Sequence, residues 1–562
     1  MSRNKTFQNV LIILGYCLLA IICDFAFFKY RVIWGANDTQ FHLGRINEWL
    51  HLNQGQFPYL STHSLGGVGA QINVFYPSQL LYPLVVLIKV FQHPVASLYV
   101  YVALLSILTA LLTDYATYSI FKNRRLSVLT AVFYTFSFYR MLSFYHQFDL
   151  GQLIAMTFVP LAFSGFYKVL SNDSGKWQLV VGMAGMIFSH VMLTFLLTLL
   201  LGIIFLVVFV LAADRWRILR DCLVAAVMTA LLTAAFWLPM IVHMFQVPTG
   251  LQPTYWKVST VISNSLSGTC KNILLNQMST YHTPGTFLIV VGLTAAVYIL
   301  WNYRQTPKVI SISAILFLIL FWMTTAAFPW HWFDHTFVTV IQFASRLCAF
   351  ITLFASLIIA YGITVLLDGF RDREFFTYFA IFVSCGMTLA SVQSTIDSYL
   401  VNQPVITNKT FADFSAVKKH NALFDYFPQA AQPYLNDLSS NQAIINGKKH
   451  YLKGYGSANA INYTVQTNSR KNTIDLPCLN YGSHAYQITN NQKAITASFS
   501  RRGTFLVRTK TKKNHLRIAY VPTTTDRLAV WISAISWLVF ILVIIYFRLH
   551  KNIKVNTQLG NL

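Results

Sequence analysis

Nineteen consecutive residues carry no charged side chain in the stretch Phe195-Leu-Leu-Thr-Leu-Leu-Leu-Gly-Ile-Ile-Phe-Leu-Val-Val-Phe-Val-Leu-Ala-Ala213. A helix of roughly 20 apolar residues spans the hydrocarbon core of a bilayer. The rest of the chain is similar, since 55% of its 562 residues are hydrophobic and only 11% are charged. Soluble domains carry about 25% charged residues. The composition excludes a soluble enzyme, a disordered protein and a fibrous repeat, and it predicts an all-α polytopic membrane bundle.

Twelve apolar stretches are predicted to cross the membrane. They lie near residues 8–28, 95–120, 127–139, 150–170, 177–194, 195–213, 217–244, 284–303, 308–327, 341–367, 375–395 and 527–547. One further apolar stretch, Gln79 to Phe91, contains Pro83 and is too short to span a bilayer.

The loop charges decide how this short stretch lies, because cytosolic loops are enriched in Lys and Arg. If 79–91 does not cross, one side of the membrane receives all the basic loop clusters. These are Arg3/Lys5, Lys122/Arg124/Arg125, Lys168/Lys176, Arg215/Arg217/Arg220, Arg304/Lys308, Arg371/Arg373 and Arg548/Lys551/Lys554. We therefore expect a re-entrant or interfacial helix at 79–91, a retained first span and two cytosolic termini. The polar segments 29–78, 140–149, 245–283 and 396–526 then lie outside.

The longest polar segment, 396–526, alternates polar and apolar residues over short runs, which is typical of antiparallel strands. We expect a small β-rich extracytoplasmic domain near 440–525. The predicted organisation is a membrane domain at 1–395, this external domain at 396–526, and a last span with a cytosolic tail at 527–562.

The net charge of +24 is concentrated in short loops beside apolar segments, so nucleic acid is not an expected partner. The external segment holds 16 Lys and Arg against 6 Asp and Glu between 397 and 526. Such a surface suits an anionic cell-envelope polymer or lipid headgroups, or it serves solubility alone. The sequence contains no CxxC and no Cys/His cluster, so it supports neither a zinc site nor a disulfide framework.

Ionisable side chains gather at the expected external edge of the membrane, where they are costly and tend to mark sites. The first external loop holds Asp38, His42 and Arg45. Residues 40–52 have apolar side chains at helical spacing, so we expect an amphipathic helix in the membrane interface. Asp38 would precede this helix, either as its N-cap or as a functional carboxylate.

The second external loop adds Arg140, His146 and Asp149, and the outer ends of two later spans add His190 and Arg346. Asp149 is again either a helix cap or a functional carboxylate, and a lone His190 is more often structural. Arg346 at a membrane edge needs an anionic partner, which lipid phosphate, a protein carboxylate or a ligand phosphate would supply.

Short motifs occur in a fixed order along the chain: Asn37-Asp38-Thr-Gln-Phe-His42, Gln56-Phe-Pro58, Asn73-Val-Phe-Tyr76-Pro77, Tyr139-Arg140, Asp149-Leu-Gly-Gln152, Ser189-His190, Phe236-Trp237-Leu238-Pro239, Ile341-Gln342-Phe343 to Arg346, and Asp425-Tyr-Phe-Pro428. In this order they resemble the YfhO-type bacterial membrane proteins, distant members of the GT-C glycosyltransferase superfamily. Two positions depart from that pattern. An acidic residue is usual near Gln152, and Pro-Trp-Arg is more typical than Ala344-Ser345-Arg346.

The resemblance implies a bacterial plasma-membrane enzyme of GT-C-like fold. It would transfer a sugar, with inversion, from a polyprenyl-phosphate donor to a wall polymer, glycolipid or exopolysaccharide outside. In such a reaction a carboxylate takes the acceptor proton, and a cationic group or a metal stabilises the departing phosphate. The resemblance implies Asp38 as this base, with Asp149 as the next candidate. Substrate or phosphate contacts would come from His42, Arg45, Arg140, His146, His190 and Arg346.

Without an Asp-x-Asp pair, a divalent metal such as Mg or Mn is neither required nor excluded. Two other functions stay compatible with the sequence. A lipid or polysaccharide transporter would place its polar residues near mid-membrane. A non-catalytic assembly factor for an envelope polymer would tolerate loss of Asp38 while needing the external domain.

The predicted topology is testable at Asn123, which lies in a basic loop and is expected in the cytosol. A cysteine at this position should resist a membrane-impermeant maleimide applied to intact cells and react after permeabilisation. A cysteine introduced between 440 and 525 should react in both cases. Labelling of position 123 from outside contradicts the topology.

Overall fold

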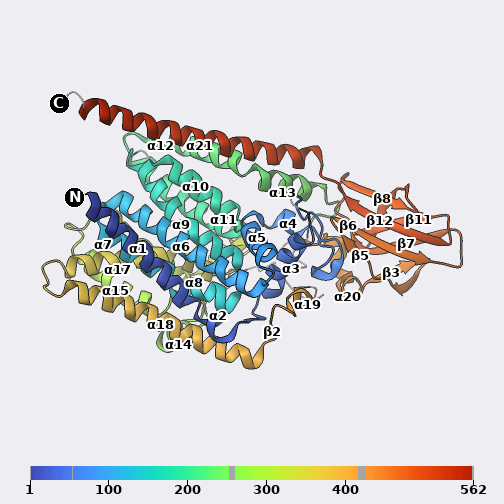
Figure 1. The fold of residues 1–562 in the computed structure, drawn as a ribbon, viewed down its shortest axis with the longest axis horizontal. Coiled ribbons are helices and arrows are strands. Elements are labelled where there is room, and N and C mark those ends of the chain that lie inside the picture. The colour runs from blue at the N-terminus through green and yellow to red at the C-terminus, as the bar shows by residue number, and fades with distance from the viewer. Residues whose placement is uncertain (1, 54, 174, 252–259, 416–425, 560–562) are drawn as a thin grey trace.

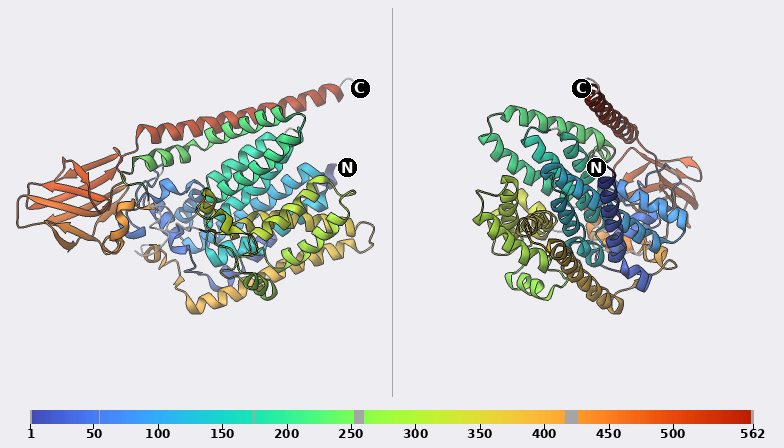
Figure 2. Two further views of the ribbon diagram at one scale, coloured as in Figure 1. Left: turned by 180° about the vertical axis from the view of Figure 1, so that it is seen from behind. Right: turned by 60° about the vertical axis from the view of Figure 1, so that its left-hand side comes forward.

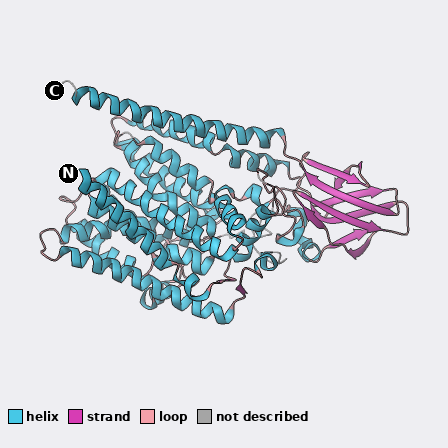
Figure 3. Cartoon of the chain, viewed as in Figure 1, coloured by secondary structure: helices cyan, strands magenta, loops and turns pink. Residues whose placement is uncertain are grey.

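The computed structural model describes residues 2–53, 55–173, 175–251, 260–415 and 426–559. Its helices form an elongated bundle with both chain ends at one end and a block of strands at the other (Figures 1 and 3). Within the described ranges, seven helices are long and apolar enough to cross a membrane. They are Thr6–Cys23 of α1 (Ser2–Cys23), α6 (Pro94–Phe121), α9 (Leu150–Leu170), α11 (Val191–Leu211), Ala344–Leu366 including α17 (Cys348–Leu366), α18 (Arg373–Asn402) and Thr524–Phe547 of α21 (Thr524–Leu559). The chain is a multi-pass helical membrane protein.

Shorter helices occupy the other predicted spans. They are α7 (Arg124–Thr135), α10 (Lys176–Ile187), α15 (Thr286–Trp301) and α16 (Lys308–Met323), of 12 to 16 residues each. The predicted span 217–244 is divided into α12 (Arg215–Leu232) and α13 (Ala234–Gln246), which are bent by 78° relative to each other. Counted as one span, this pair makes eight candidate crossings among the described residues, so twelve crossings are not confirmed.

The α9–α10 pair brings two candidate site residues to one end of the bundle. A Cβ atom at Gly165 would overlap the backbone of Leu179, and one at Gly182 would overlap the backbone of Ala162. Small residues allow such close backbone approach between membrane helices. Because the two helices are antiparallel neighbours, Asp149 before α9 and the turn after α10 lie at the same end.

The helix predicted to lie in the membrane interface is instead enclosed by protein. In α3 (Thr39–Leu50), ten of twelve residues are buried. Its Glu48 accepts hydrogen bonds from the backbone N–H groups of His63 (2.9 Å) and Ser64 (2.7 Å). The polar face that helical spacing identifies is therefore covered by protein, because the loop that follows α3 supplies polar partners for it.

The short apolar stretch at 79–91 forms a 3₁₀ turn (Gln79–Leu81) and α5 (Tyr82–Phe91), which lies beside α3 and α6. The next helix, α6, starts near the C-terminal end of α18, since the Val95 N–H donates to Asn408 Oδ1 at 3.0 Å. Both α1 and α6 therefore reach the end of the bundle where the strands lie (Figure 1). The stretch 79–91 is thus a short apolar helix at this end of the bundle, and the membrane side of each loop stays a prediction.

The strands form a β-sandwich, which confirms the predicted β-rich region. Two five-stranded antiparallel sheets have the orders β10-β11-β7-β3-β4 and β5-β6-β12-β8-β9. Their strands are β3 (Gln442–Ile445), β4 (Lys448–Tyr451), β5 (Tyr455–Ser457), β6 (Ala460–Gln466), β7 (Asn472–Leu479), β8 (Tyr486–Asn490), β9 (Lys493–Ala494), β10 (Ala497–Phe499), β11 (Thr504–Thr509) and β12 (Lys513–Tyr520). Apolar side chains from both sheets share one core, for example Leu476 and Phe505 against Ile461 and Ile518.

A buried polar joint connects this sandwich to the bundle. The Tyr520 hydroxyl, at the end of β12, donates to Asp526 Oδ2 at 2.7 Å. His243 of α13 places its Nε2 3.2 Å from Asp526 Oδ1, and both side chains are 1% exposed. From this joint α21 runs along α13 and α12 on one side of the bundle (Figure 2).

Asp526→Asn is expected to destabilise the protein. The Asn amide carries no charge to pair with His243, and only its oxygen accepts hydrogen bonds. One of the buried groups that now bind the two carboxylate oxygens therefore loses its partner. Such a loss costs about 1–3 kcal/mol in free energy of unfolding. Thermal unfolding of the protein in nanodiscs measures the effect.

The matched control is Asp437→Asn, which removes the surface ion pair with Lys449, whose side chain is 63% exposed. Surface pairs contribute about 0–1 kcal/mol. Equal shifts in Tm for the two variants would show that the joint adds no particular stability.

Candidate functional site

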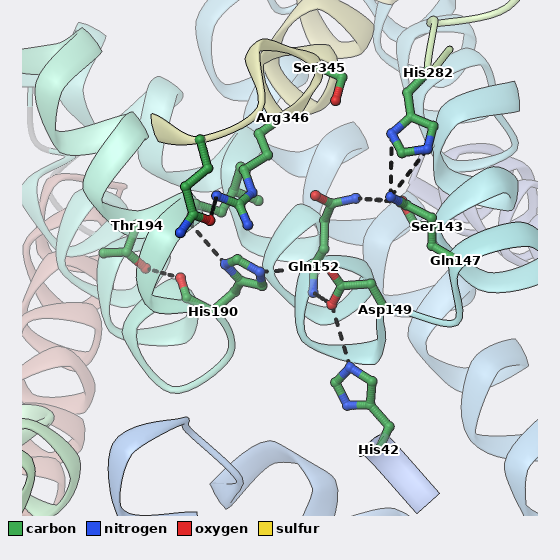
Figure 4. Close-up of polar contacts among 12 residues, drawn as sticks. His42, Ser143, Gln147, Asp149, Gln152, His190, Thr194, His282, Ser345 and Arg346 are labelled. Atoms are coloured by element: carbon green, nitrogen blue, oxygen red, sulfur yellow. Dashed lines mark hydrogen bonds and ion pairs between the residues drawn. The ribbon is translucent and has the colours of Figure 1, made fainter. Parts of the chain in front are cut away.

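Asp149 lies at the centre of a polar cluster, directly before α9. Its Oδ1 accepts a hydrogen bond from the Gln152 backbone N–H at 2.9 Å, so it caps the helix. The same carboxylate lies 3.6 Å from His42 Nε2 and 3.6 Å from His190 Nε2 (Figure 4). His190 is itself a cap, because its Nδ1 accepts from the Leu193 N–H at the start of α11. Asp149 and His190 thus both start helices and meet in the site.

The two imidazoles keep Asp149 ionised. Burial opposes ionisation, but the charge of His190 and the hydrogen bonds from His190 and His42 outweigh it, and the pKa of Asp149 lies well below its ordinary value. Burial lowers the pKa of His42 to about 4, so this imidazole is neutral at pH 7. Its Nδ1 faces the Arg45 guanidinium at 3.5 Å, which leaves Nε2–H to donate to the carboxylate.

Asp38 occupies the N-cap position of α3, but its side chain makes no cap hydrogen bond. Its backbone N–H donates to the Gln147 carbonyl at 2.9 Å, which holds it against the π-helical turn η3 (Ser143–Gln147). Burial and the charge of Asp149 raise the pKa of Asp38 to about 7, although Arg346 opposes them. A partly exposed carboxyl that titrates near pH 7 is suited to proton transfer.

Arg346 lies in a 3₁₀ turn, η6 (Ala344–Leu347), that leads into α17. Its Nη1 donates to the Ile341 carbonyl at 3.0 Å and to Gln342 Oε1 at 2.9 Å, which orients the guanidinium. Within the described ranges Nε and Nη2 have no hydrogen-bond partner. This free edge of the guanidinium interacts electrostatically with Asp149 and can bind an oxyanion.

Arg45 has a positioning role. Its Nε donates to Asn73 Oδ1 at 3.1 Å, its Nη2 donates to the carbonyls of Tyr76 and Pro77, and its guanidinium lies over the Tyr76 ring at 4.3 Å. Burial lowers the pKa of Arg45 to about 10, so it stays cationic at pH 7. Because most of its donors already bind protein atoms, Arg45 holds the 73–77 segment beside the site.

The structure places Arg140 outside this cluster and His146 at its border. Arg140 is fully buried, and its Nη1 donates to Ser106 Oγ at 2.9 Å on α6. His146 contacts the Tyr399 hydroxyl on α18 through Nδ1. Of the eight site residues expected from the sequence, six are in or beside the Asp149 cluster: Asp38, His42, Arg45, Asp149, His190 and Arg346.

Four further polar side chains connect parts of the site. Gln152 Nε2 donates to Ser143 Oγ at 2.8 Å and lies 3.4 Å from Gln147 Oε1. Gln147 in turn reaches the ring nitrogens of His282 at 3.3 and 3.4 Å. The sequence gives no signal for His282, which follows a polar loop with no motif around it. In the described part of the chain, no group of three or more His, Cys, Asp and Glu side chains is arranged to hold a metal ion.

An apolar groove of about 650 Å³ lies beside the cluster, between α9, α10, α11, α12 and α13. Its walls include Phe166, Met183, Leu201, Cys222 and Met240. Thr194 also lines it, and the Thr194 hydroxyl donates to the His190 carbonyl at 2.9 Å. The groove therefore ends within one helical turn of the site.

Fold and site together define a multi-pass membrane protein whose acid, imidazole and guanidinium groups meet at the end of the bundle nearest a β-sandwich. Residues 4–388 match the sequence profile described as "Family of unknown function (DUF6541)". The chain belongs to this family, and the match includes all residues of the Asp149 cluster. No curated protein matches the chain. Asp425, part of the last motif noted in the sequence, lies outside the described residues.

The raised pKa of Asp38 predicts a pH-dependent effect on stability. The unfolded chain loses this proton near pH 3.8, whereas the folded chain holds it until about pH 7. The stability from the protonated form is therefore lost as pH rises through 7. Asp38→Asn removes the charge, so it should raise Tm at pH 8 and raise it less at pH 5, where the folded chain still holds the proton but the unfolded chain has already lost it. Thermal unfolding at the two pH values gives the comparison, and a lower Tm at pH 8 contradicts it.

Proposed function

We propose that this protein is a GT-C-type glycosyltransferase that moves a sugar, with inversion, from a polyprenyl-phosphate donor to an envelope acceptor outside the cell. The proposal includes the likeness to YfhO-type proteins, twelve crossings and two cytosolic termini in a bacterial plasma membrane. The observation that carries it is the state of Asp38. This carboxyl makes no cap bond, titrates near pH 7 and lies in the field of an ionised Asp149 and of Arg346.

In the proposed reaction Asp38 accepts the proton of the acceptor hydroxyl. The acceptor oxygen forms a bond to the anomeric carbon from the face opposite the phosphate, and the bond from that carbon to the phosphate oxygen breaks. The bonding electrons leave with polyprenyl phosphate. A base with a pKa near the working pH is the most effective, and the free edge of Arg346 stabilises the charge on the leaving phosphate.

The apolar groove supports a lipid-linked donor. Its apolar walls suit an isoprenoid chain, and Val191 and Thr194, which line it, lie within one helical turn of His190. A lipid in this groove would present its phosphate at the polar cluster. The cluster lies toward the sandwich end of the bundle, which favours an enzyme acting at a membrane surface over a transporter with a mid-membrane site.

Asp38→Asn is expected to reduce transfer by ~10²–10⁴-fold, the usual effect of losing a general base. The assay follows radiolabelled hexose from polyprenyl-phosphate hexose into envelope membranes, with purified protein in nanodiscs. The native chain should gain activity as pH rises toward about 7 and then reach a plateau. Near-native transfer by Asp38→Asn excludes Asp38 as the base, and Asp149 then becomes the candidate to test.

Arg346→Lys keeps the positive charge but loses the planar guanidinium. One charge-assisted hydrogen bond is worth about 1.5–3 kcal/mol, so the KM for the donor should rise on the order of 10-fold or more. Arg140→Lys is the control, because Arg140 lies outside the cluster. An unchanged donor KM for Arg346→Lys removes Arg346 from the phosphate site.

A further inference from the structure

A second polar group lies against the backbone that holds Asp38. The Gln147 carbonyl accepts the Asp38 N–H at 2.9 Å, and the Gln147 side chain reaches toward the His282 ring (Figure 4). The rings of His146 and His282 are 6.1 Å apart and nearly perpendicular, at 82°. These three side chains come from two distant parts of the sequence, and the backbone of one of them, Gln147, holds the backbone of Asp38.

This group has hydrogen-bonding capacity that the described protein atoms do not use. His146 is 8% exposed, and its Nε2 has no hydrogen-bond partner although it is buried. Buried polar atoms are normally satisfied, so such an atom calls for an explanation. The Gln147 amide lies at similar distances from both nitrogens of His282 and can satisfy only one of them well.

The fold holds His282 firmly in this place. Its carbonyl accepts a hydrogen bond from Asn264 Nδ2 at 2.9 Å and lies 3.6 Å from Cys348 Sγ. Cys348 is the first residue of α17 and follows Arg346 by two positions. The turn that presents Arg346 therefore also fixes the backbone of His282.

The charge state of the group distinguishes it from the Arg346 side of the site. Burial lowers the pKa of His146 to about 4, and burial together with His146 lowers the pKa of His282 to about 3. Both rings are neutral at pH 7, so each offers one N–H donor and one acceptor nitrogen. Neutral donors and acceptors match hydroxyl groups, whereas a phosphate is bound by cationic donors.

We propose that His146, Gln147 and His282 form a subsite that binds the hydroxyl groups of an uncharged sugar. That this sugar is the acceptor of the transfer rests on the proposed function. That the subsite binds hydroxyl groups rests on these three side chains alone. In this proposal the partner of His146 is a sugar hydroxyl, whereas the sequence resemblance implied a contact with substrate or phosphate. A sugar held here would then present one of its hydroxyl groups to Asp38, whose N–H the Gln147 carbonyl holds.

The first experiment separates acceptor from donor binding. Transfer from polyprenyl-phosphate hexose is measured against increasing amounts of envelope membranes for the native chain, His146→Gln and His282→Gln. We expect each variant to need about 10-fold more membranes for half-maximal transfer, the effect of one lost hydrogen bond of about 1.4 kcal/mol. The donor KM should stay within about twofold, and His450→Gln, an exposed histidine on β4 of the sandwich, should match the native chain. A raised donor KM or unchanged membrane dependence overturns the subsite.

The second experiment needs no turnover. Neutral oligosaccharides on an array are bound to Asp38→Asn protein, with and without His282→Gln, and sodium phosphate is the competitor. We expect binding of at least one neutral glycan, about 10-fold weaker binding with His282→Gln, and no displacement by millimolar phosphate. Absence of glycan binding, or displacement by phosphate, overturns the subsite. If glycans bind through His282 but the native chain turns over no donor, the proposed transferase function fails and the subsite stands.

Discussion

Three distant segments of the chain meet at the Asp149 carboxylate. It caps α9 through the Gln152 N–H and lies 3.6 Å from each of two imidazoles, His42 on α3 and His190 before α11. In a low-dielectric interior such charge-assisted contacts are strong, and an unpaired carboxylate there would be costly. The position of α3 follows from this contact. Because the His42 N–H bonds the Asp38 carbonyl one turn earlier, fixing His42 also fixes Asp38.

The two carboxylates have different environments, and this difference sets their chemistry. Asp149 has two imidazoles in contact and stays ionised. Burial and the negative charge of Asp149 both oppose ionisation of Asp38, and only Arg346 favours it, so the pKa of Asp38 rises to about 7. Pairs of titratable groups whose surroundings separate their pKa values are the usual arrangement in acid–base catalysis. The ionised Asp149 is therefore a positioning and electrostatic partner of Asp38.

Composition and periodicity predicted the parts of the fold that depend on local pattern. The apolar stretches became helices, and the alternating residues of 442–520 became strands. The enclosure of α3 was missed because a helical pattern shows a polar face without showing what covers it. Likewise the N-cap position of Asp38 was readable, but only the geometry shows that its side chain makes no cap bond.

The site arginines show the same limit. The sequence places three arginines near the expected membrane edge: Arg45, Arg140 and Arg346. Their neighbouring residues do not indicate which of them contacts a ligand. The structure separates them by their places. Arg45 binds the backbone of the 73–77 segment, Arg140 is buried away from Asp149 with only its Nη1 hydrogen-bonded among the described residues, and Arg346 is held by Ile341 and Gln342 beside Asp149. His282 carried no signal at all, since its role depends on contacts with residues more than a hundred positions away.

The β-sandwich contributes to the site through the loop that covers α3. In this loop the Val68 carbonyl accepts from the Leu479 N–H at 2.8 Å, and the Tyr59 N–H donates to Asn459 Oδ1 at 2.8 Å. The loop thus lies between the sandwich and the polar face of α3, where His63 and Ser64 bind Glu48. The loop holds this face of α3 against the sandwich. The covering of α3 at Glu48 therefore depends on a domain that lies beyond the matched residues 4–388.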